Sequence, residues 1–345
     1  MMRRLLNTLF VTSENAYLTL DGDNIVVKEN GRELGRFPFV NLSDIISFSY
    51  AGASSALMGA CAERKIGLSF CTPNGRFLAR VTGNGKGQNV LLRRQQYRVA
   101  DDQAQSCEIA RNFIFGKIYN ARWSIERTRR DHPQRIESEK FVAATETLQG
   151  ILSNVFLERD LDSLRGWEGV ASKVYFSVFD DMILRDKENF FFHERNRRPP
   201  LDNVNALLSF AYILLEHDCA SALESVGLDS YVGFMHRDRP GRQSLALDLM
   251  EELRPCFADR FVLTLINNRV INADDFICSE SGAVRLSTEA RSTFLKYWRT
   301  RKQEELKHPF LNEKIPWGLV PYVQALLLVR YLRGDLDGYP AFLWK

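Results

Sequence analysis

The first 82 residues alternate short apolar runs with turn residues. Asn30-Gly31, which lies between two such runs, is a strong hairpin signal. Residues 53–64 are rich in alanine and leucine and predict one helix. The pattern therefore predicts a β-rich, β-sandwich-like N-terminal domain over residues 1–82 with one short helix. The runs that predict strands are 17–20, 25–27, 37–39, 45–48, 67–71 and 77–81.

From Asn89 onward the apolar residues recur with the period of a helix, and Pro199-Pro200 separates two groups of helical segments. We expect an all-α C-terminal domain over residues 101–345. Residues 83–100 are expected to hold a linker and the start of the first long helix. The fold class is thus α+β with more than one domain. The predicted helices span 89–127, 136–157, 163–184, 202–217, 221–226, 244–266 with an interruption at Pro255, 288–307 and 316–333.

A glycine-rich stretch, Gly83-Asn84-Gly85-Lys86-Gly87, interrupts the pattern between the two parts. One interpretation is a loop that cradles phosphate. Such a loop would need a lysine followed by serine or threonine at the start of a helix, and that ending is absent here. A flexible linker is the favoured interpretation.

Composition narrows the class of protein. Apolar residues make up 45% of the chain and charged residues 26%, which is the balance of a globular protein rather than a disordered tail. The six cysteines include no C-x-x-C pair, so a zinc ribbon is not expected. The apolar run near the N-terminus is too short for a signal peptide, and no stretch approaches the ~20 apolar residues of a membrane helix. We expect a cytoplasmic protein without membrane contact.

Charge is distributed unevenly along the chain. Residues 1–100 hold 13 Lys/Arg and 7 Asp/Glu, a net charge of +6, whereas the remainder holds 33 basic and 36 acidic residues, a net charge of −3. A basic front and an acidic rear suit a protein that contacts phosphate with one face and holds carboxylates elsewhere. A chance asymmetry of solvated surfaces is the alternative.

His236 lies in a polar stretch, 233–242, whose two glycines and one proline predict a loop. Asp248 and Glu251 follow on a predicted helix, where positions i and i+3 share a face. A loop imidazole opposite two helical carboxylates is a donor set suited to Mn²⁺ or Mg²⁺. The alternative is a surface histidine beside an acidic helix start. This stretch alone does not decide between them.

Glu168 is the candidate for a further acidic ligand. It stands in Gly166-Trp167-Glu168-Gly169, on the shoulder of an apolar helical stripe. Each glycine inside a helix destabilises it by about 1 kcal/mol relative to alanine, and leaves room for another backbone or a ligand. A common first-turn glutamate is the alternative.

Two arginine clusters suit the phosphate backbone of DNA, and no sequence-specific DNA-reading motif is visible. Any single cluster is more often a solvated face, so only the set indicates nucleic-acid binding. We therefore expect low-specificity contacts to the DNA backbone from Arg93, Arg94, Arg98, Arg195, Arg197 and Arg198.

Three segments together resemble signatures of the CRISPR adaptation integrases, the Cas1 family. They are residues 166–169, residues 197–210 and residues 227–255, the last containing Asp248-Leu249-Met250-Glu251 and Arg254-Pro255. Their order and spacing agree with the family, as do the strand-rich front and helical rear. The resemblance covers nearly the whole chain and is to the type I, subtype C members.

The resemblance implies that Glu168, His236 and Glu251 are catalytic and ligate one Mn²⁺ or Mg²⁺ ion. Asp248 matches an additional acidic position that some members use, and we favour Glu251 over Asp248 as the third ligand. The implied activity is that of a metal-dependent DNA integrase and endonuclease. It inserts short duplex DNA into a CRISPR array by 3′-hydroxyl transesterification, in antiviral defence.

The resemblance also implies partners. Family members are homodimers through the N-terminal domain, and they hold double-stranded DNA together with a small adaptation partner, Cas2. Two alternatives remain. One is a non-catalytic DNA-binding scaffold in which the acids and His236 are structural, and the other is a plain divalent-metal nuclease without integrase activity.

Overall fold

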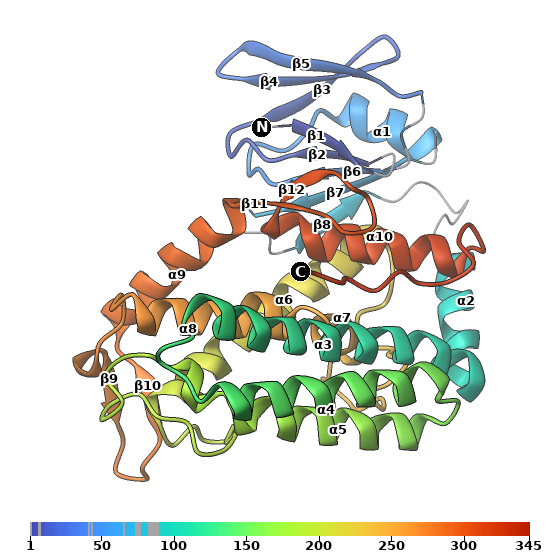
Figure 1. Cartoon of the computed structure of the whole chain (residues 1–345). Coiled ribbons are helices and arrows are strands. Elements are labelled where there is room, and N and C mark those ends of the chain that lie inside the picture. Colours follow the sequence, from blue (N-terminus) through green and yellow to red (C-terminus); the bar gives the residue numbers. More distant parts are fainter. Residues whose placement is uncertain are drawn as a thin grey trace.

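A mixed five-stranded sheet forms the base of the N-terminal part (Figure 1). The computed structural model describes residues 2–5, 8–40, 42, 44–64, 66–72, 77–81 and 90–345. Strand β2 pairs in parallel with β6, and β6 with β7, while the two outer pairs are antiparallel. The order across the sheet is β1 (Met2–Leu5), β2 (Thr8–Val11), β6 (Asp44–Ser47), β7 (Gly67–Cys71) and β8 (Phe77–Val81).

A three-stranded antiparallel sheet lies above the first one, with helix α1 (Ser55–Glu63) beside it (Figure 1). The Asn30-Gly31 hairpin is confirmed, because both residues have positive φ (50° and 79°), as a type I′ turn requires. Leu18, Ile25, Leu57 and Leu68 are buried together between these elements. The expected β-rich front with one short helix is therefore confirmed. The upper sheet consists of β3 (Tyr17–Asp21), β4 (Asn24–Glu29) and β5 (Arg32–Pro38).

Three long antiparallel helices form one layer of the rear part: α3 (Gln103–Asp131), α4 (Ser138–Leu157) and α5 (Leu161–Ser177) (Figure 1). Helix α6 (Asn203–Val226) runs through the core and packs against α7 (Ser244–Glu251) and α10 (Val320–Leu332). Short 3₁₀ turns occur at Asp180–Met182, Ala273–Asp275 and Trp317–Leu319.

The prediction of one helix over 89–127 was wrong. The segment forms two helices, α2 (Val90–Asp101) and α3, which separate at Asp102. The Asp102 carboxylate accepts hydrogen bonds from the N–H groups of Ala104 (2.9 Å) and Gln105 (3.1 Å), so it caps the start of α3. The apolar periodicity continues on both sides of this cap, and periodicity alone therefore could not reveal the break.

Other boundaries also differ from the predictions. The helix expected over 163–184 ends at Ser177, and the two helices expected over 202–226 are one, α6. The interruption expected at Pro255 is a π-helical turn, Arg254–Asp259, between α7 and α8 (Arg260–Asn267).

The rear part is not entirely helical, because it also contains two hairpins of three-residue strands. These strands are too short to produce an alternating pattern. Helix α9 (Thr288–Gln303) lies between the hairpins and ends earlier than expected. The hairpins are β9 (Phe276–Cys278) with β10 (Val284–Leu286), and β11 (Glu305–Lys307) with β12 (Lys314–Pro316).

The front and rear parts share one continuous apolar contact. The rings of Phe10 and Phe48 meet Tyr322 of α10 edge-on, at 6.2 and 5.2 Å between centroids. Ser69 Oγ donates to the carbonyl of Ser225 at the end of α6 (2.9 Å). The glycine-rich stretch 83–87 and the expected boundary at 82/83 lie outside the described residues. The division into domains at these residues therefore stays a prediction.

Helix α6 is long and apolar enough to cross a membrane by length and composition, contrary to our expectation that no stretch would qualify. Of its most apolar window, 61% is buried inside the molecule. Its partners include α7, α10 and strands β7 and β8 of the front sheet. These contacts are those of a core helix.

Candidate active site

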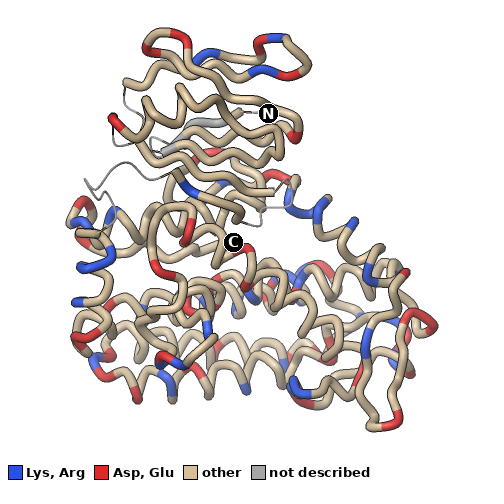
Figure 2. Tube along the Cα trace, turned by 180° about the vertical axis from the view of Figure 1, so that it is seen from behind, with Lys and Arg blue, Asp and Glu red and all other residues tan. Residues whose placement is uncertain are grey.

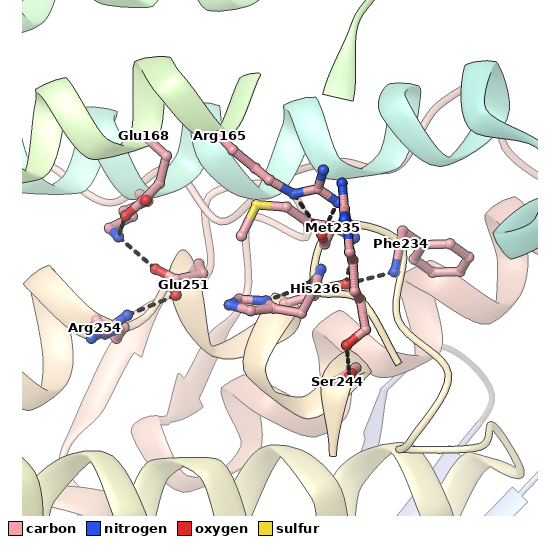
Figure 3. Close-up of polar contacts among 11 residues, drawn as sticks. Arg165, Glu168, Phe234, Met235, His236, Ser244, Glu251 and Arg254 are labelled. Carbon is pink, nitrogen blue, oxygen red and sulfur yellow. Dashed lines mark hydrogen bonds and ion pairs between the residues drawn. The ribbon is translucent and has the colours of Figure 1, made fainter. Parts of the chain in front are cut away.

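Glu168 lies on α5 and faces α3 across a cavity of about 500 Å³. Its Oε1 atom accepts a hydrogen bond from Ser172 Oγ (2.8 Å), one turn further along the same helix. The same oxygen contacts the ammonium of Lys117, which projects from α3. The carboxylate is thus held between two helices and remains partly exposed to the cavity (Figure 3).

Glu251 is the last residue of α7, and only 4% of its side chain is exposed. Arg254 Nη1 donates to Oε1 (2.7 Å), and Lys117 Nζ lies 2.7 Å from Oε2. Burial by itself would raise the pKa of Glu251, but Arg254 and Lys117 overcome this and hold the pKa well below its usual range. Glu251 is therefore a permanent buried anion.

The Oε2 atom of Glu251 is buried and accepts no hydrogen bond of good geometry from the described residues. Its contact with Lys117 is a charge contact whose angle is not that of a hydrogen bond. A buried carboxylate oxygen without a hydrogen-bond donor is rare in folded proteins. This atom is the one on Glu251 that is available to a cation.

His236 follows a tight loop and extends toward Glu251 (Figure 3). Its Nδ1 atom lies 2.6 Å from Asp248 Oδ1, which places the proton of a neutral ring on Nδ1. Nε2 then carries a lone pair, and no described residue donates a hydrogen bond to it. His236 therefore presents one free ligating nitrogen.

Asp248 is fully buried and has a different role from Glu251. Its Oδ2 accepts from the N–H groups of Phe234 (2.6 Å) and Met235 (2.9 Å), and its Oδ1 accepts from the N–H (3.0 Å) and Nδ1 of His236. These four bonds use the lone pairs of both oxygens. Asp248 thus shapes the histidine loop and orients the imidazole, which favours Glu251 as the ligand.

Two further features hold this loop in place. Arg165, one turn before Glu168 on α5, donates to the carbonyl of Met235 through both Nε (3.1 Å) and Nη2 (2.6 Å). A Cβ on Gly233 would lie 2.8 Å from Asp248 Oδ2 and 2.9 Å from Ser244, so only glycine fits there. Arg165 thus ties the histidine loop to the helix that carries Glu168.

The donor chemistry fits a hard divalent cation: two carboxylates and one imidazole nitrogen. In the arrangement described, however, no three His, Cys, Asp or Glu side chains in the described part of the chain are placed to hold one ion. Lys117 contacts both Glu168 and Glu251 and so occupies the space between them. Lys117 thus holds Glu168 and Glu251 together, and His236 lies beside Glu251 (Figure 3).

A family model described as CRISPR associated protein Cas1 matches residues 9–300. The chain belongs to the Cas1 family. It is 49% identical over 348 residues to a CRISPR-associated endonuclease Cas1 of Rhodospirillum rubrum, and 48% identical over 344 residues to one of Chlorobaculum tepidum. In both comparisons 100% of each chain is covered. The resemblance to this family seen in the sequence is confirmed, while subtype C stays a prediction.

Solved structures have the same fold. A casposase bound to integration product matches with a TM-score of 0.81 at 21% identity, covering 98% of this chain and 99% of that one. A chain of a partial Cas6-RT-Cas1–Cas2 complex matches with a TM-score of 0.75 at 24% identity, covering 97% and 98%. The α+β architecture of a strand-rich front and a helical rear is thus that of the Cas1 family.

The arginines expected to contact DNA fall into two groups. Arg94 and Arg98 are exposed on α2, whereas Arg93 donates to the carbonyl of Gly227 (3.2 Å). Arg195 and Arg197 line the same cavity as Glu168. Basic and acidic residues are intermixed over the helical part (Figure 2). Of the second cluster, Arg195 and Arg197 thus lie on the cavity that Glu168 also lines, and Arg198 is exposed.

Arg195 itself is largely committed to the protein. Its guanidinium donates to Asn205 Oδ1 (2.6 Å) and Ser209 Oγ (3.0 Å), which fixes the loop before α6. This loop forms one wall of the cavity. Arg195 therefore shapes the entrance, and Arg197 is the freer of the two.

Lys117 and Arg165 were not identified from the sequence as residues of the site, and no role was assigned to Arg254. Lys117 is the one charged residue between Phe113 and Ala121, in an otherwise apolar and small stretch of a helix. A lone lysine on a buried face was a signal that a carboxylate partner must exist. The sequence could not show which carboxylates these were.

Proposed function

We propose that this chain is a divalent-metal-dependent DNA integrase and endonuclease of CRISPR adaptation, which inserts short duplex DNA into a CRISPR array. The observation that carries the proposal is the set of candidate ligand atoms: the partly exposed Glu168 carboxylate, Oε2 of Glu251, which accepts no hydrogen bond of good geometry from the described residues, and Nε2 of His236. Membership of the Cas1 family supports it. So does the fold of a casposase that was solved bound to integration product.

The proposed reaction is a transesterification. The 3′-hydroxyl oxygen of the incoming DNA forms a bond to the phosphorus of a phosphodiester at the edge of a repeat. The bond from that phosphorus to the 3′-oxygen of the target strand breaks, and the proton of the attacking hydroxyl passes to the departing oxygen through solvent. When water replaces the hydroxyl, the same exchange is hydrolysis, which is the endonuclease activity.

We propose that Glu168, His236 and Glu251 hold one Mn²⁺ or Mg²⁺ ion. When bound, it would polarise the phosphoryl oxygen and stabilise charge on the departing oxygen. Arg254 keeps Glu251 ionised and in one orientation. Asp248 holds His236 through Nδ1, so the imidazole acts as a ligand through Nε2 and not as a general base.

The proposed partners are double-stranded DNA, a second copy of the chain through the N-terminal part, and Cas2. The partner Cas2 is supported by the fold shared with a chain from a Cas1–Cas2 complex. Exposed arginines on α2 and beside the cavity suit the DNA backbone. We further propose that the protein acts in the cytoplasm.

The test is an integration assay with a short 3′-hydroxyl duplex and a supercoiled plasmid that carries a repeat array. We expect covalently joined products with Mn²⁺ or Mg²⁺ and none with a chelator. His236→Ala should lower the yield by at least about 100-fold. His132→Ala, at an exposed histidine, is the matched control and should not change it.

A plain nuclease is the second candidate, because the curated relatives are named as endonucleases. It predicts nicked plasmid without joined product under the same conditions. A non-catalytic scaffold predicts DNA binding that needs no metal and neither product. Activity that persists in full in His236→Ala would show that the residues assigned to the site are wrong.

A further inference from the structure

Lys117 is the residue whose position the proposed reaction does not explain. It projects from the middle of α3, and 12% of its side chain is exposed. Its ammonium contacts Glu168 Oε1 and lies 2.7 Å from Glu251 Oε2. Those two oxygens belong to two of the three proposed metal ligands. A positive charge of the chain itself therefore occupies the space that the metal would need.

The charges around Glu251 are balanced without a metal. Two carboxylates, Glu168 and Glu251, face two cations, Lys117 and Arg254. Two carboxylates this close together would repel each other if the cation between them were absent. A divalent ion added to the intact cluster would meet that cation within contact distance, and like charges at such a distance repel strongly in a poorly solvated site. The metal and one of the two cations therefore exclude each other.

Lys117 is the cation that can leave. Arg254 is held by Glu251 and also stacks over the ring of Tyr212, 4.3 Å from its centroid. Lys117 contacts no described charged group other than Glu168 and Glu251. Its ammonium is carried on a flexible four-carbon stem, whereas a guanidinium is rigid and planar. Rotation of that stem frees an oxygen on each carboxylate at once.

We infer that Lys117 is a built-in substitute for the metal ion: it holds Glu168 and Glu251 together in the unloaded site and is displaced when a divalent cation binds. The inference rests on the proposed metal site and deepens it. Lys117 acts here as a positioning residue, because it acts through the two carboxylates. The free energy of breaking its two ion pairs opposes metal binding.

Lys117 lines the cavity of about 500 Å³, and the displaced ammonium would move into it. The lining of that cavity carries the cations Lys173, Arg195 and Arg197 together with the acids Glu194 and Asp259, and an added anion would pair with the displaced ammonium there. A DNA phosphate in the cavity would supply that anion. Metal and DNA should therefore strengthen each other's binding, and Lys117 should be the residue that couples them.

The experiment is a calorimetric titration of the purified full chain with Mn²⁺ alone. Lys117→Met removes the charge and keeps the length of the side chain. We expect it to bind Mn²⁺ about tenfold more tightly than the wild type, and to have a lower Tm than the wild type without metal. Lys117→Arg retains a cation and should bind no more tightly than the wild type. Lys173→Met, on the same cavity wall but without a carboxylate partner among the described residues, should leave the affinity unchanged.

The outcomes separate this inference from the proposed function. Equal or weaker Mn²⁺ binding by Lys117→Met, with wild-type binding that His236→Ala abolishes, would overturn the inference and leave the metal site intact. Failure of both the wild type and Lys117→Met to bind Mn²⁺ would remove the metal site itself. If Lys117→Met does not fold without metal, Lys117→Gln replaces it, because an amide can still donate to one carboxylate, and a smaller increase in affinity is expected.

A second titration tests the coupling. A short 3′-hydroxyl duplex should tighten Mn²⁺ binding in the wild type by a larger factor than in Lys117→Met. Equal factors in the two proteins would show that the displaced ammonium does not meet the phosphate.

Discussion

Asp248 is a buried carboxylate whose hydrogen bonds all go to the histidine loop. It accepts three backbone N–H bonds from consecutive residues and one from His236. Such a cluster of donors fixes the orientation of the carboxylate. The geometry explains why Asp248 stands three residues before Glu251 on the same helix. Asp248 holds the histidine loop by hydrogen bonds, and Glu251 faces the site.

Asp248→Asn should therefore damage the loop rather than a ligand. An amide NH₂ would point at one pair of N–H donors, and the remaining oxygen would carry no charge. We expect a loss of about 2–4 kcal/mol in the free energy of unfolding, measured by urea denaturation without metal. Asp238→Asn, at an exposed position of the same loop, should change it by less than about 0.5 kcal/mol. Similar values for both variants would contradict the role assigned to Asp248.

His308 makes the stability depend on pH. It is fully buried, its Nδ1 accepts from the N–H of Leu311 (3.3 Å), and its Nε2 faces Gln324 Oε1 (3.1 Å), so the ring is neutral with its proton on Nε2. Burial lowers its pKa to about 4, and the contact with Gln324 opposes this only in part. A proton on Nδ1 would also face the Leu311 N–H.

The sign follows from the lowered pKa. Between pH of about 6.5, the ordinary pKa of histidine, and pH of about 4, His308 is protonated in the unfolded chain but stays neutral in the folded protein. Stability is thus lost as pH falls through this window, by up to about 3 kcal/mol. His308→Gln should lose less over the same window in urea denaturation at a series of pH values. His132→Gln, at an exposed site, is the control and should follow the wild type.

The histidine loop and helix α7 act as one element. Gly233 allows the loop to approach Ser244 and Asp248 at distances that no Cβ tolerates. Gly233→Ala should shift the loop, move His236 away from Glu251 and weaken Mn²⁺ binding. We expect a loss of about 1–3 kcal/mol in the free energy of unfolding.

Gly166→Ala is the matched substitution, because a Cβ there meets nothing within 4 Å. It lies inside α5, where alanine should stabilise the helix by up to about 1 kcal/mol. The prediction of open space beside the glycines near Glu168 thus holds in the structure. If both variants were destabilised to the same degree, the close approach at Gly233 would not be the cause.

For helices and strands, the sequence predicted the type of each element well and its first and last residues less well. The strands of the front sheet and the helices of the rear could be predicted from their periods, because those periods reflect burial of one face. The break at Asp102 is a capping contact, and the turn at 254–259 is a π-helical adjustment around a proline. Neither changes the apolar period, and both were therefore missed or only placed approximately.

On the scale of the whole molecule, neighbouring residues serve opposite sides of the core. Glu251 faces the site, whereas Glu252 accepts from Tyr339 Oη (2.5 Å) and from the N–H of Phe342 (2.7 Å) in the C-terminal segment. Asn120 of α3 joins the same contact by donating to the carbonyls of Glu252 and Phe342 (2.7 Å each). The turn after α7 is therefore held from both sides.

Contacts between residues far apart in the sequence limited how much of the site could be predicted. Glu168, His236 and Glu251 could be proposed from local motifs and from the family resemblance. Lys117 could not, because it lies 51 residues from Glu168 and is joined to it only by the packing of α3 on α5. Arg165 was missed for a similar reason, since its partner is a backbone carbonyl of a distant loop.

The most direct test of the central claim is an anomalous difference map at the manganese edge, from crystals of the full chain grown with Mn²⁺. We predict one peak within ligand distance of Glu168, Nε2 of His236 and Oε2 of Glu251. Asp248 should remain bonded to Nδ1 of His236, and the Lys117 ammonium should have left the space between the two glutamates. A peak ligated by Asp248 in place of Glu251, or no peak among these residues at saturating Mn²⁺, would contradict the account.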